Sequence, residues 1–121
     1  RFALTYESSA SDVFKEYCLR LNEGDTKLLL KKLAPTRLVT NSFRDAVEAA
    51  EDRGASAEEL RELLGRGRAK KGIFEGDLEE GELEIGQVAS LFRQQQSVAE
   101  VMKELLEEYE RRKQTLTTNL F

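Results

Sequence analysis

Three glycines interrupt a run of carboxylates between residues 74 and 87, and this segment constrains the fold more than any other part of the chain. The glycines are Gly76, Gly81 and Gly86, and the pair Gly86-Gln87 opens an apolar helical pattern. A solvated acidic surface does not need glycine, whereas a backbone that takes positive φ or passes close to another group does. We therefore expect a loop that lies against a ligand at the start of a helix.

The carboxylates of this segment admit two interpretations. An exposed acidic turn near a helix N-terminus interacts favourably with the helix dipole, whereas paired carboxylates can bind a hard cation or exchange protons. The spacing is not that of an EF-hand loop, so the exposed turn is preferred and no metal site is predicted. The carboxylates are Glu75, Asp77, Glu79, Glu80, Glu82 and Glu84.

Length and charge exclude several classes of protein. The 121 residues fit one domain and fall short of the roughly 250 of a (β/α)8 barrel. Because the chain begins at Arg1 and its only methionine is Met102, we expect it to be a fragment of a longer protein. A net charge of −4 argues against nucleic acid as a partner, and no apolar run approaches the ~18 residues of a membrane span. One cysteine, Cys18, fits a reducing compartment, so a cytoplasmic location is expected.

Hydrophobic periodicity and capping residues predict an α+β, helix-rich chain. Short strands are expected at 2–5, 28–30, 36–39 and 72–74. Helices are expected after a cap at Ser9 or Ser11, after Asn41 or Ser42, after the capping box Ser56/Glu59, over 83–92, and after the capping box Ser97/Glu100. The helix over 98–109 has the clearest apolar stripe, and residues 113–121 are expected to form a loose tail.

Two segments resemble a known family. Glu75-Gly76-Asp77, Glu79-Glu80-Gly81 and Gly86-Gln87 resemble the flavin-side loop of the flavin-dependent type II enoyl-acyl-carrier-protein reductases and the related nitronate monooxygenases. Arg1-Phe2 and Glu7-Ser8 resemble the end of that family's last barrel strand. The resemblance covers nearly the whole chain but only about the C-terminal third of a family member.

This resemblance implies the C-terminal part of an FMN-binding TIM barrel enzyme with a small inserted substrate or lid domain. Residues 1–5 would end the last barrel strand, and 6–95 would form the small domain and the flavin-side loop. Residues 96–121 would form a C-terminal helix that packs on the barrel, followed by the tail.

The resemblance also implies where the cofactor binds. Gly86 would let a flat ring approach the backbone, and the Gln87 amide offers a donor and an acceptor to a flavin edge. The alternative from residue type alone is a packing glycine and an ordinary helix-start glutamine. Just before Gly-Gln the family usually carries small or apolar residues such as Ser, Met and Ala, whereas this chain has Glu82, Glu84 and Ile85, so the two carboxylates could alter substrate choice. The expected cofactor-binding residues are Leu83, Glu84, Gly86, Gln87 and Arg1.

A basic stretch is the candidate site for a phosphate. Arg66, Arg68 and Lys70, followed by Lys71, could bind the 2′-phosphate of NADPH or the phosphopantetheine of a carrier protein. The alternative is a solvated loop. A second basic group consists of Lys31, Lys32 and Arg37.

The resemblance implies that the parent is an FMN-dependent NAD(P)H oxidoreductase that reduces the enoyl double bond of acyl-carrier-protein thioesters. The alternatives are a nitronate monooxygenase and a non-enzymatic helical module that binds a partner through 98–109. The chain has no histidine, and the family's catalytic histidine and phosphate loop lie upstream, so no catalytic residue is expected here and the chain alone is expected to be inactive. The expected partners are the N-terminal part of the parent, a carrier protein or a small nitronate, and a second copy in a homodimer.

Overall fold

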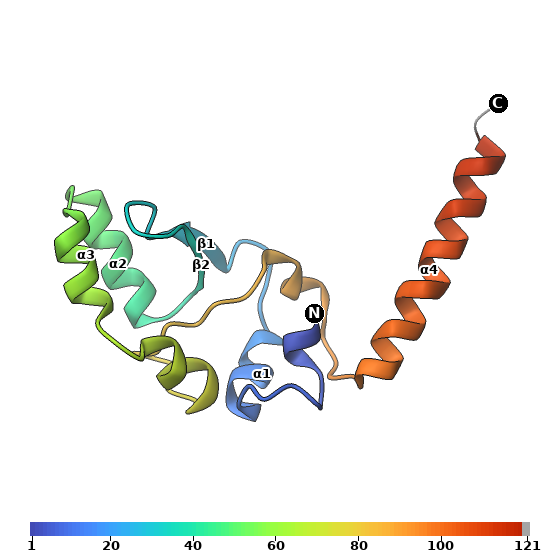
Figure 1. The fold of residues 1–121 in the computed structure, drawn as a ribbon, viewed down its shortest axis with the longest axis horizontal. Coiled ribbons are helices and arrows are strands. Elements are labelled where there is room, and N and C mark those ends of the chain that lie inside the picture. Colours follow the sequence, from blue (N-terminus) through green and yellow to red (C-terminus); the bar gives the residue numbers. More distant parts are fainter. Residues whose placement is uncertain (120–121) are drawn as a thin grey trace.

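The structure is a computed structural model that describes residues 1–119 (Figure 1). Short helices alternate with a hairpin before one long helix. The elements in chain order are η1 (Phe2–Leu4), α1 (Asp12–Cys18), β1 (Thr26–Leu29), β2 (Thr36–Val39), α2 (Ser42–Asp52), α3 (Ala57–Leu64), η2 (Lys70–Phe74), η3 (Gln87–Leu91) and α4 (Val98–Asn119). The η1 and η3 elements are 3-10 helices, and η2 is a π-helix.

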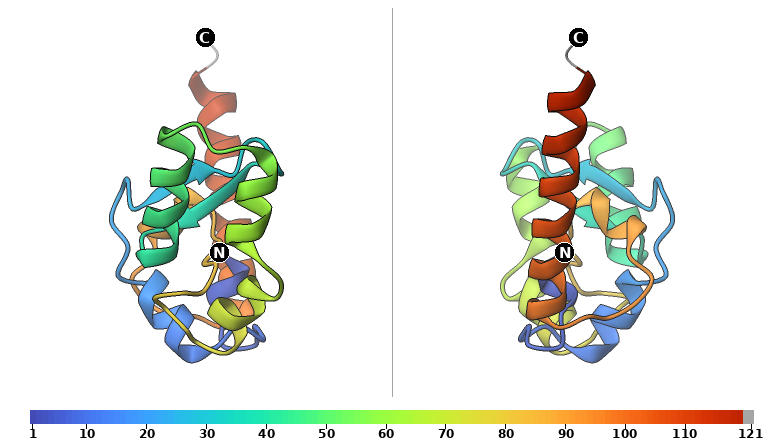
Figure 2. Two further views of the ribbon diagram at one scale, coloured as in Figure 1. Left: turned by 90° about the vertical axis from the view of Figure 1, so that its left-hand side faces the viewer. Right: turned by 90° about the vertical axis from the view of Figure 1, so that its right-hand side faces the viewer.

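The elements form an elongated body. Helices α2 and α3 lie with the hairpin at one end, and α1 and η1 lie near the middle (Figure 1). Helix α4 stands at the other end and points away from the body (Figure 1), and the two end-on views of Figure 2 show it behind or in front of the other elements. Among the described residues, no helix combines the length and apolar character needed to cross a bilayer.

The hairpin joins two hydrophobic clusters. Strands β1 and β2 are antiparallel, with Thr26 opposite Val39 and Leu29 opposite Thr36. Successive residues of a strand point to opposite faces, so Leu38 packs under α2 and α3 while Val39 packs with α1. The first cluster contains Leu29, Leu30, Leu38, Phe43, Val47, Ala50, Ala55 and Leu60. The second contains Leu4, Ala10, Phe14, Cys18, Leu21, Val39, Leu83 and Ala89.

Side-chain caps begin the four α-helices, as the sequence predicts. Ser11 caps α1 and Asn41 caps α2, which selects one residue from each predicted pair. Both predicted capping boxes are present, because Ser56 and Glu59 bond reciprocally at α3 and Ser97 and Glu100 do so at α4. These bonds satisfy amides that have no partner within a helix.

Two predicted strands are wrong. Residues 2–5 form a 3-10 turn, because the amides of Leu4 and Thr5 bond to the nearby carbonyls of Arg1 and Phe2. Residues 72–74 belong to the π-helix η2, where Gly72 packs against the backbone of Gly81.

The predicted helix over 83–92 and the predicted tail are also corrected. Leu83 and Glu84 are extended, since Leu83 O accepts from Val39 N at 2.8 Å and Glu84 bridges to Leu38, so only Gln87–Leu91 is helical. Residues 113–119 continue α4, and residues 120 and 121 lie outside the described part. Ion pairs one turn apart support the helix there, such as Lys113 with Glu110 at 3.6 Å.

Candidate functional site

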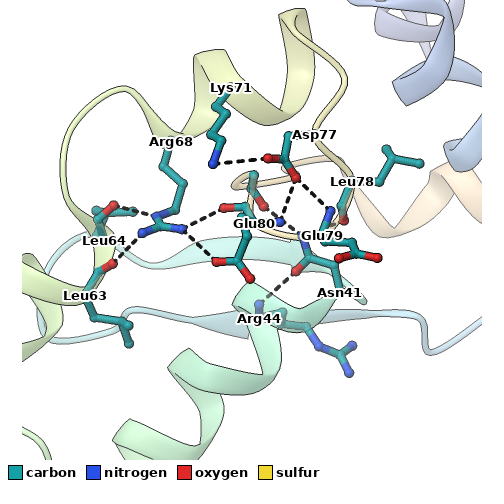
Figure 3. Close-up of polar contacts among 11 residues, drawn as sticks. Asn41, Arg44, Leu63, Leu64, Arg68, Lys71, Asp77, Leu78, Glu79 and Glu80 are labelled. Carbon is teal, nitrogen blue, oxygen red and sulfur yellow. Dashed lines mark hydrogen bonds and ion pairs between the residues drawn. The ribbon is translucent and has the colours of Figure 1, made fainter.

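The acidic loop, residues 75–84, is held to the rest of the protein by hydrogen bonds to its backbone carbonyls (Figure 3). Asn41 Nδ2 donates to the carbonyls of Leu78 and Gly81 at 3.1 and 2.7 Å. Phe43 N donates to Glu79 O at 3.1 Å, and Arg68 Nη1 donates to Glu80 O at 2.7 Å. Each carbonyl from residue 78 to residue 81 therefore has a protein donor, and the turn is held in one position.

Asp77 shapes this turn from within. Its Oδ1 accepts from the amides of Glu80 and Glu79 at 2.9 and 3.1 Å, and its Oδ2 pairs with Lys71 at 3.1 Å. The bond from the Glu80 amide, followed by the bond from Lys71, lowers the pKa of Asp77 below its usual value. Asp77 is thus a structural carboxylate, and residues 1–119 contain no acidic, histidine or cysteine cluster arranged to hold a metal ion.

The structure separates the three glycines by function. Gly76 has a φ of +80°, which favours glycine over other residues. A Cβ at Gly81 would lie 2.2 Å from the Cα of Gly72 and 2.3 Å from Asp77 O, so this glycine permits a close backbone approach. Gly86 has an ordinary φ of −66°, and a Cβ there would meet no atom within 4 Å. Only Gly86 lacks a reason within the described residues to be glycine.

Gly86 and Gln87 are exposed at the start of η3. Gln87 borders an open hollow of about 600 Å³ between η3 and the turn that precedes β1. The hollow combines apolar and polar side chains, and its lining residues are Glu23, Gly24, Thr26, Gln87, Val88, Ser90, Leu91 and Arg93. The predicted flavin-side pair is therefore accessible, as a cofactor contact requires.

The residues just before this pair differ in exposure. Leu83 is buried in the core and its carbonyl is bonded to Val39, so its side chain has no free surface for a cofactor. Glu84 is exposed, whereas Glu82 is only 8% exposed. Burial, followed by the hydrogen bond that the protonated Glu82 donates to Glu84 and by the negative charge of Glu84, raises the pKa of Glu82 to about 7. Of the predicted cofactor residues in this segment, Glu84, Gly86 and Gln87 are accessible.

Arg1 lies far along the chain from the loop but beside the last helix. Its guanidinium sits 4.5 Å from the centre of the Phe92 ring, donates to Gln96 Oε1 at 2.9 Å, and pairs with Glu104. These contacts tie Arg1 to α4 and the linker before it. The polar contacts of Arg1 therefore lead to α4 rather than to Gly86, and its role toward a cofactor stays a prediction.

Of the predicted phosphate-binding residues, Arg66 and Arg68 line one open hollow of about 280 Å³ together with Lys71, whereas Lys70 is not part of its lining. Arg68 donates to the carbonyls of Leu63, Leu64 and Glu80, and lies 4.4 Å from the Phe43 ring centre. Lys70 pairs with Glu75 at 3.5 Å, while Arg66 is exposed at the tip of the loop. In the second basic group, Lys32 donates to Ala55 O and Arg37 to Thr26. Arg66 is thus the member of the stretch that is best placed to meet a ligand.

Two positioning contacts were not predicted from the sequence. Asn41 was expected only as a helix cap, and the spacing of residues gives no signal that it also reaches residues 78 and 81. The Glu7 carboxylate accepts from Val98 N at 3.0 and 3.2 Å, which caps α4 from the opposite end of the chain. Both contacts depend on residues that are distant in the sequence.

The model of the nitronate monooxygenase family matches residues 1–108, and the chain belongs to this family. Among solved structures, it is similar to FabK from Thermotoga maritima, with 26% identity and a TM-score of 0.86. That match covers 99% of this chain and 38% of the FabK chain. A mutant of FabK from the same organism matches with 24% identity and a TM-score of 0.81, over 99% of this chain and 35% of that one, which supports the fold alone. No curated protein matches the chain.

Proposed function

We propose that this chain is part of an FMN-dependent NAD(P)H oxidoreductase and supplies the loop that faces the flavin. The observation that carries the proposal is Gly86, which is exposed, has an ordinary φ and has open space where a Cβ would stand. Because no described atom lies within 4 Å of a Cβ at this position, Gly86 leaves room for a group outside the described residues to approach its backbone closely. The family resemblance of the same segment names that group as FMN.

The residues around Gly86 fit a flavin. The Gln87 side chain is exposed and offers both a hydrogen-bond donor and an acceptor to a heterocycle edge. The adjacent hollow offers the apolar side chains of Val88 and Leu91. When bound, FMN would supply hydride transfer, and the role of these residues is to bind and orient it. Gly86 and Gln87 are the proposed contacts, and the exposed Glu84 is a further candidate.

Helix α4 is proposed to pack on the remainder of the parent enzyme. Its stripe of Met102, Leu105, Leu106, Tyr109 and Leu116 is exposed, and only Val101 of that face is buried. An apolar stripe of this length normally faces a core or a partner. Arg1 pairs with Glu104 on the same helix, so the part of a FabK-like parent that precedes this segment would arrive beside α4.

The proposed reaction is reduction of an enoyl thioester carried by an acyl-carrier protein. The structural match to FabK, a type II enoyl-acyl-carrier-protein reductase, supports this reaction. Oxidation of alkyl nitronates is the second candidate, because the matching family model is that of nitronate monooxygenase. No catalytic residue is assigned to this chain, and the acid–base group would come from the rest of the parent.

Turnover by the full-length protein separates the two reactions. The protein is incubated with FMN, NADPH and crotonyl thioester in one assay, and with FMN, oxygen and propionate 3-nitronate in another. Oxidation of NADPH that depends on the enoyl thioester supports the reductase. Consumption of nitronate and oxygen without such activity supports the monooxygenase, and inactivity in both assays contradicts the proposed function.

A further inference from the structure

The turn at 78–81 accepts hydrogen bonds from two different parts of the chain, and these bonds fix the position of the segment that follows it. We propose that Asn41 and Arg68 are positioning residues, which hold this turn and thereby place the exposed pair Gly86-Gln87 against the flavin. The inference rests on the proposed function, because it concerns how the same loop is held. Neither residue needs to touch the cofactor.

Asn41 has two separate tasks. Its Oδ1 accepts from Arg44 N at 2.8 Å and so caps α2, while its Nδ2 donates to the carbonyls of Leu78 and Gly81 (Figure 3). A serine, threonine or aspartate would satisfy the cap, but these residues lack an amide that donates to two carbonyls. The second task therefore depends on asparagine.

Arg68 joins two parts of the fold, the end of α3 and the turn at 78–81. Its Nε and Nη2 donate to Leu64 O and Leu63 O at the end of α3, at 2.7 and 3.1 Å. Its Nη1 donates to Glu80 O at 2.7 Å and lies 3.6 Å from the Glu80 carboxylate. The planar guanidinium provides these diverging donors in a fixed geometry, which a lysine ammonium does not reproduce. Arg68 thus links α3 to the turn.

The position of the turn restricts the position of the flavin-side pair Gly86-Gln87. Directly after the turn, Glu82 N donates to Arg68 O at 3.1 Å, and Leu83 O accepts from Val39 N at 2.8 Å. Glu84 bridges to Leu38. From Glu84 to Gln87 the chain spans at most about 10 Å. The contacts of Asn41 and Arg68 with the turn, which we call the clamp, and the bonds of residues 82–84 therefore limit where Gly86-Gln87 can lie.

Two conservative variants of the full-length protein test the role. Asn41→Asp keeps the helix cap but removes the amide donor. Arg68→Lys keeps the positive charge but removes the planar guanidinium and its diverging donors. Two control variants match them. Gln114→Glu on the polar side of α4 adds the same charge as Asn41→Asp, and Arg61→Lys at an exposed position of α3 matches Arg68→Lys. The measurements are the FMN dissociation constant, the visible spectrum of the bound flavin, the KM for NADPH, and amide hydrogen exchange of the peptide over residues 78–87.

For both clamp variants we expect faster exchange over 78–87, a shifted flavin spectrum and an FMN dissociation constant that is about tenfold higher or more, while both controls resemble wild type. Variants that lose thermal stability but bind FMN with unchanged affinity and spectrum would show that the clamp is only structural and overturn the inference. A rise confined to the KM for NADPH in Arg68→Lys would also overturn it, in favour of direct phosphate binding. Wild-type protein that binds no FMN would contradict the proposed function instead.

Discussion

Gly81 and Gly72 pack backbone to backbone, so closely that a Cβ on Gly81 would lie 2.2 Å from the Cα of Gly72. This approach places the turn of the acidic loop against the π-helix η2. It explains why both positions are glycine, and it separates them from Gly86, where there is room for a side chain. The glycines of this segment therefore make different predictions.

Gly81→Ala is expected to destabilise the protein strongly. The added methyl would overlap backbone atoms of Gly72 and Asp77, which cannot rotate away as a side chain can. Overpacking against backbone is expected to cost roughly 3 kcal/mol or more of unfolding free energy. Urea denaturation of the full-length protein measures this loss, and a change below about 1 kcal/mol would contradict the observed packing.

Gly86→Ala is the matched substitution at an open position. Because its φ is −66° and no atom lies within 4 Å of the place where the added methyl would stand, the unfolding free energy should change by less than about 0.5 kcal/mol. FMN affinity should nevertheless fall about tenfold, since the methyl would occupy the space through which the flavin approaches. Unchanged FMN affinity, measured by flavin fluorescence, would remove Gly86 from the proposed site.

Glu82 predicts a dependence of stability on pH. Its pKa is about 7 in the folded protein against a usual value of 4.5. The folded state therefore holds a proton that the unfolded state releases, and the stabilisation present below pH 4.5 is lost as the pH rises towards 7. One pKa unit corresponds to about 1.4 kcal/mol, so we expect a loss of at least about 1 kcal/mol across this range.

Glu82→Gln should flatten that pH dependence, because the amide does not titrate. Glu84→Gln should reduce it, because the charge of Glu84 contributes to the raised pKa of Glu82. Urea unfolding at a series of pH values compares the three proteins. A wild-type stability that rises with pH over this range, with the same slope in Glu82→Gln, would contradict the assignment.

The apolar stripe of α4 predicts that substitutions on the two faces of this helix differ in their effect on stability. Leu105 is 40% exposed in this structure, so Leu105→Ser would cost little if the helix stayed in solvent. If α4 packs on the remainder of the parent, the same substitution should destabilise the full-length protein by about 1–3 kcal/mol. Thermal unfolding measures the effect, with Lys103→Ser on the polar face of α4 as the control. Equal stabilities of the two variants would contradict the packing.

Local signals in the sequence predicted part of the fold well. The caps at Ser11, Asn41, Ser56 and Ser97 depend on residues within one turn, and the structure confirms them. The strand expected at 36–39 is also present as β2. These features are predictable because the physical contacts that create them are close in sequence.

Some of the errors arose where distant segments decide the local structure. Residues 83 and 84 have a helical apolar pattern but are extended because β2 offers them a partner. Arg68 is expected from the sequence to meet a phosphate, and the structure shows in addition that it donates to the end of α3 and to the acidic loop; its role toward a phosphate stays a prediction. The pair Gly86-Gln87 is indicated in the sequence by its resemblance to the family, whereas the contacts of Asn41 and Arg68 with the turn at 78–81 are visible only in three dimensions.

The central claim is that this chain provides the flavin-facing loop of an FMN enzyme. The flavin content of the purified full-length protein tests it most directly, by the visible absorption spectrum and by release of the cofactor on denaturation. The account predicts a yellow protein that releases FMN in proportion to protein, and that takes up added FMN again after the cofactor has been stripped. A colourless protein that does not bind added FMN would contradict it.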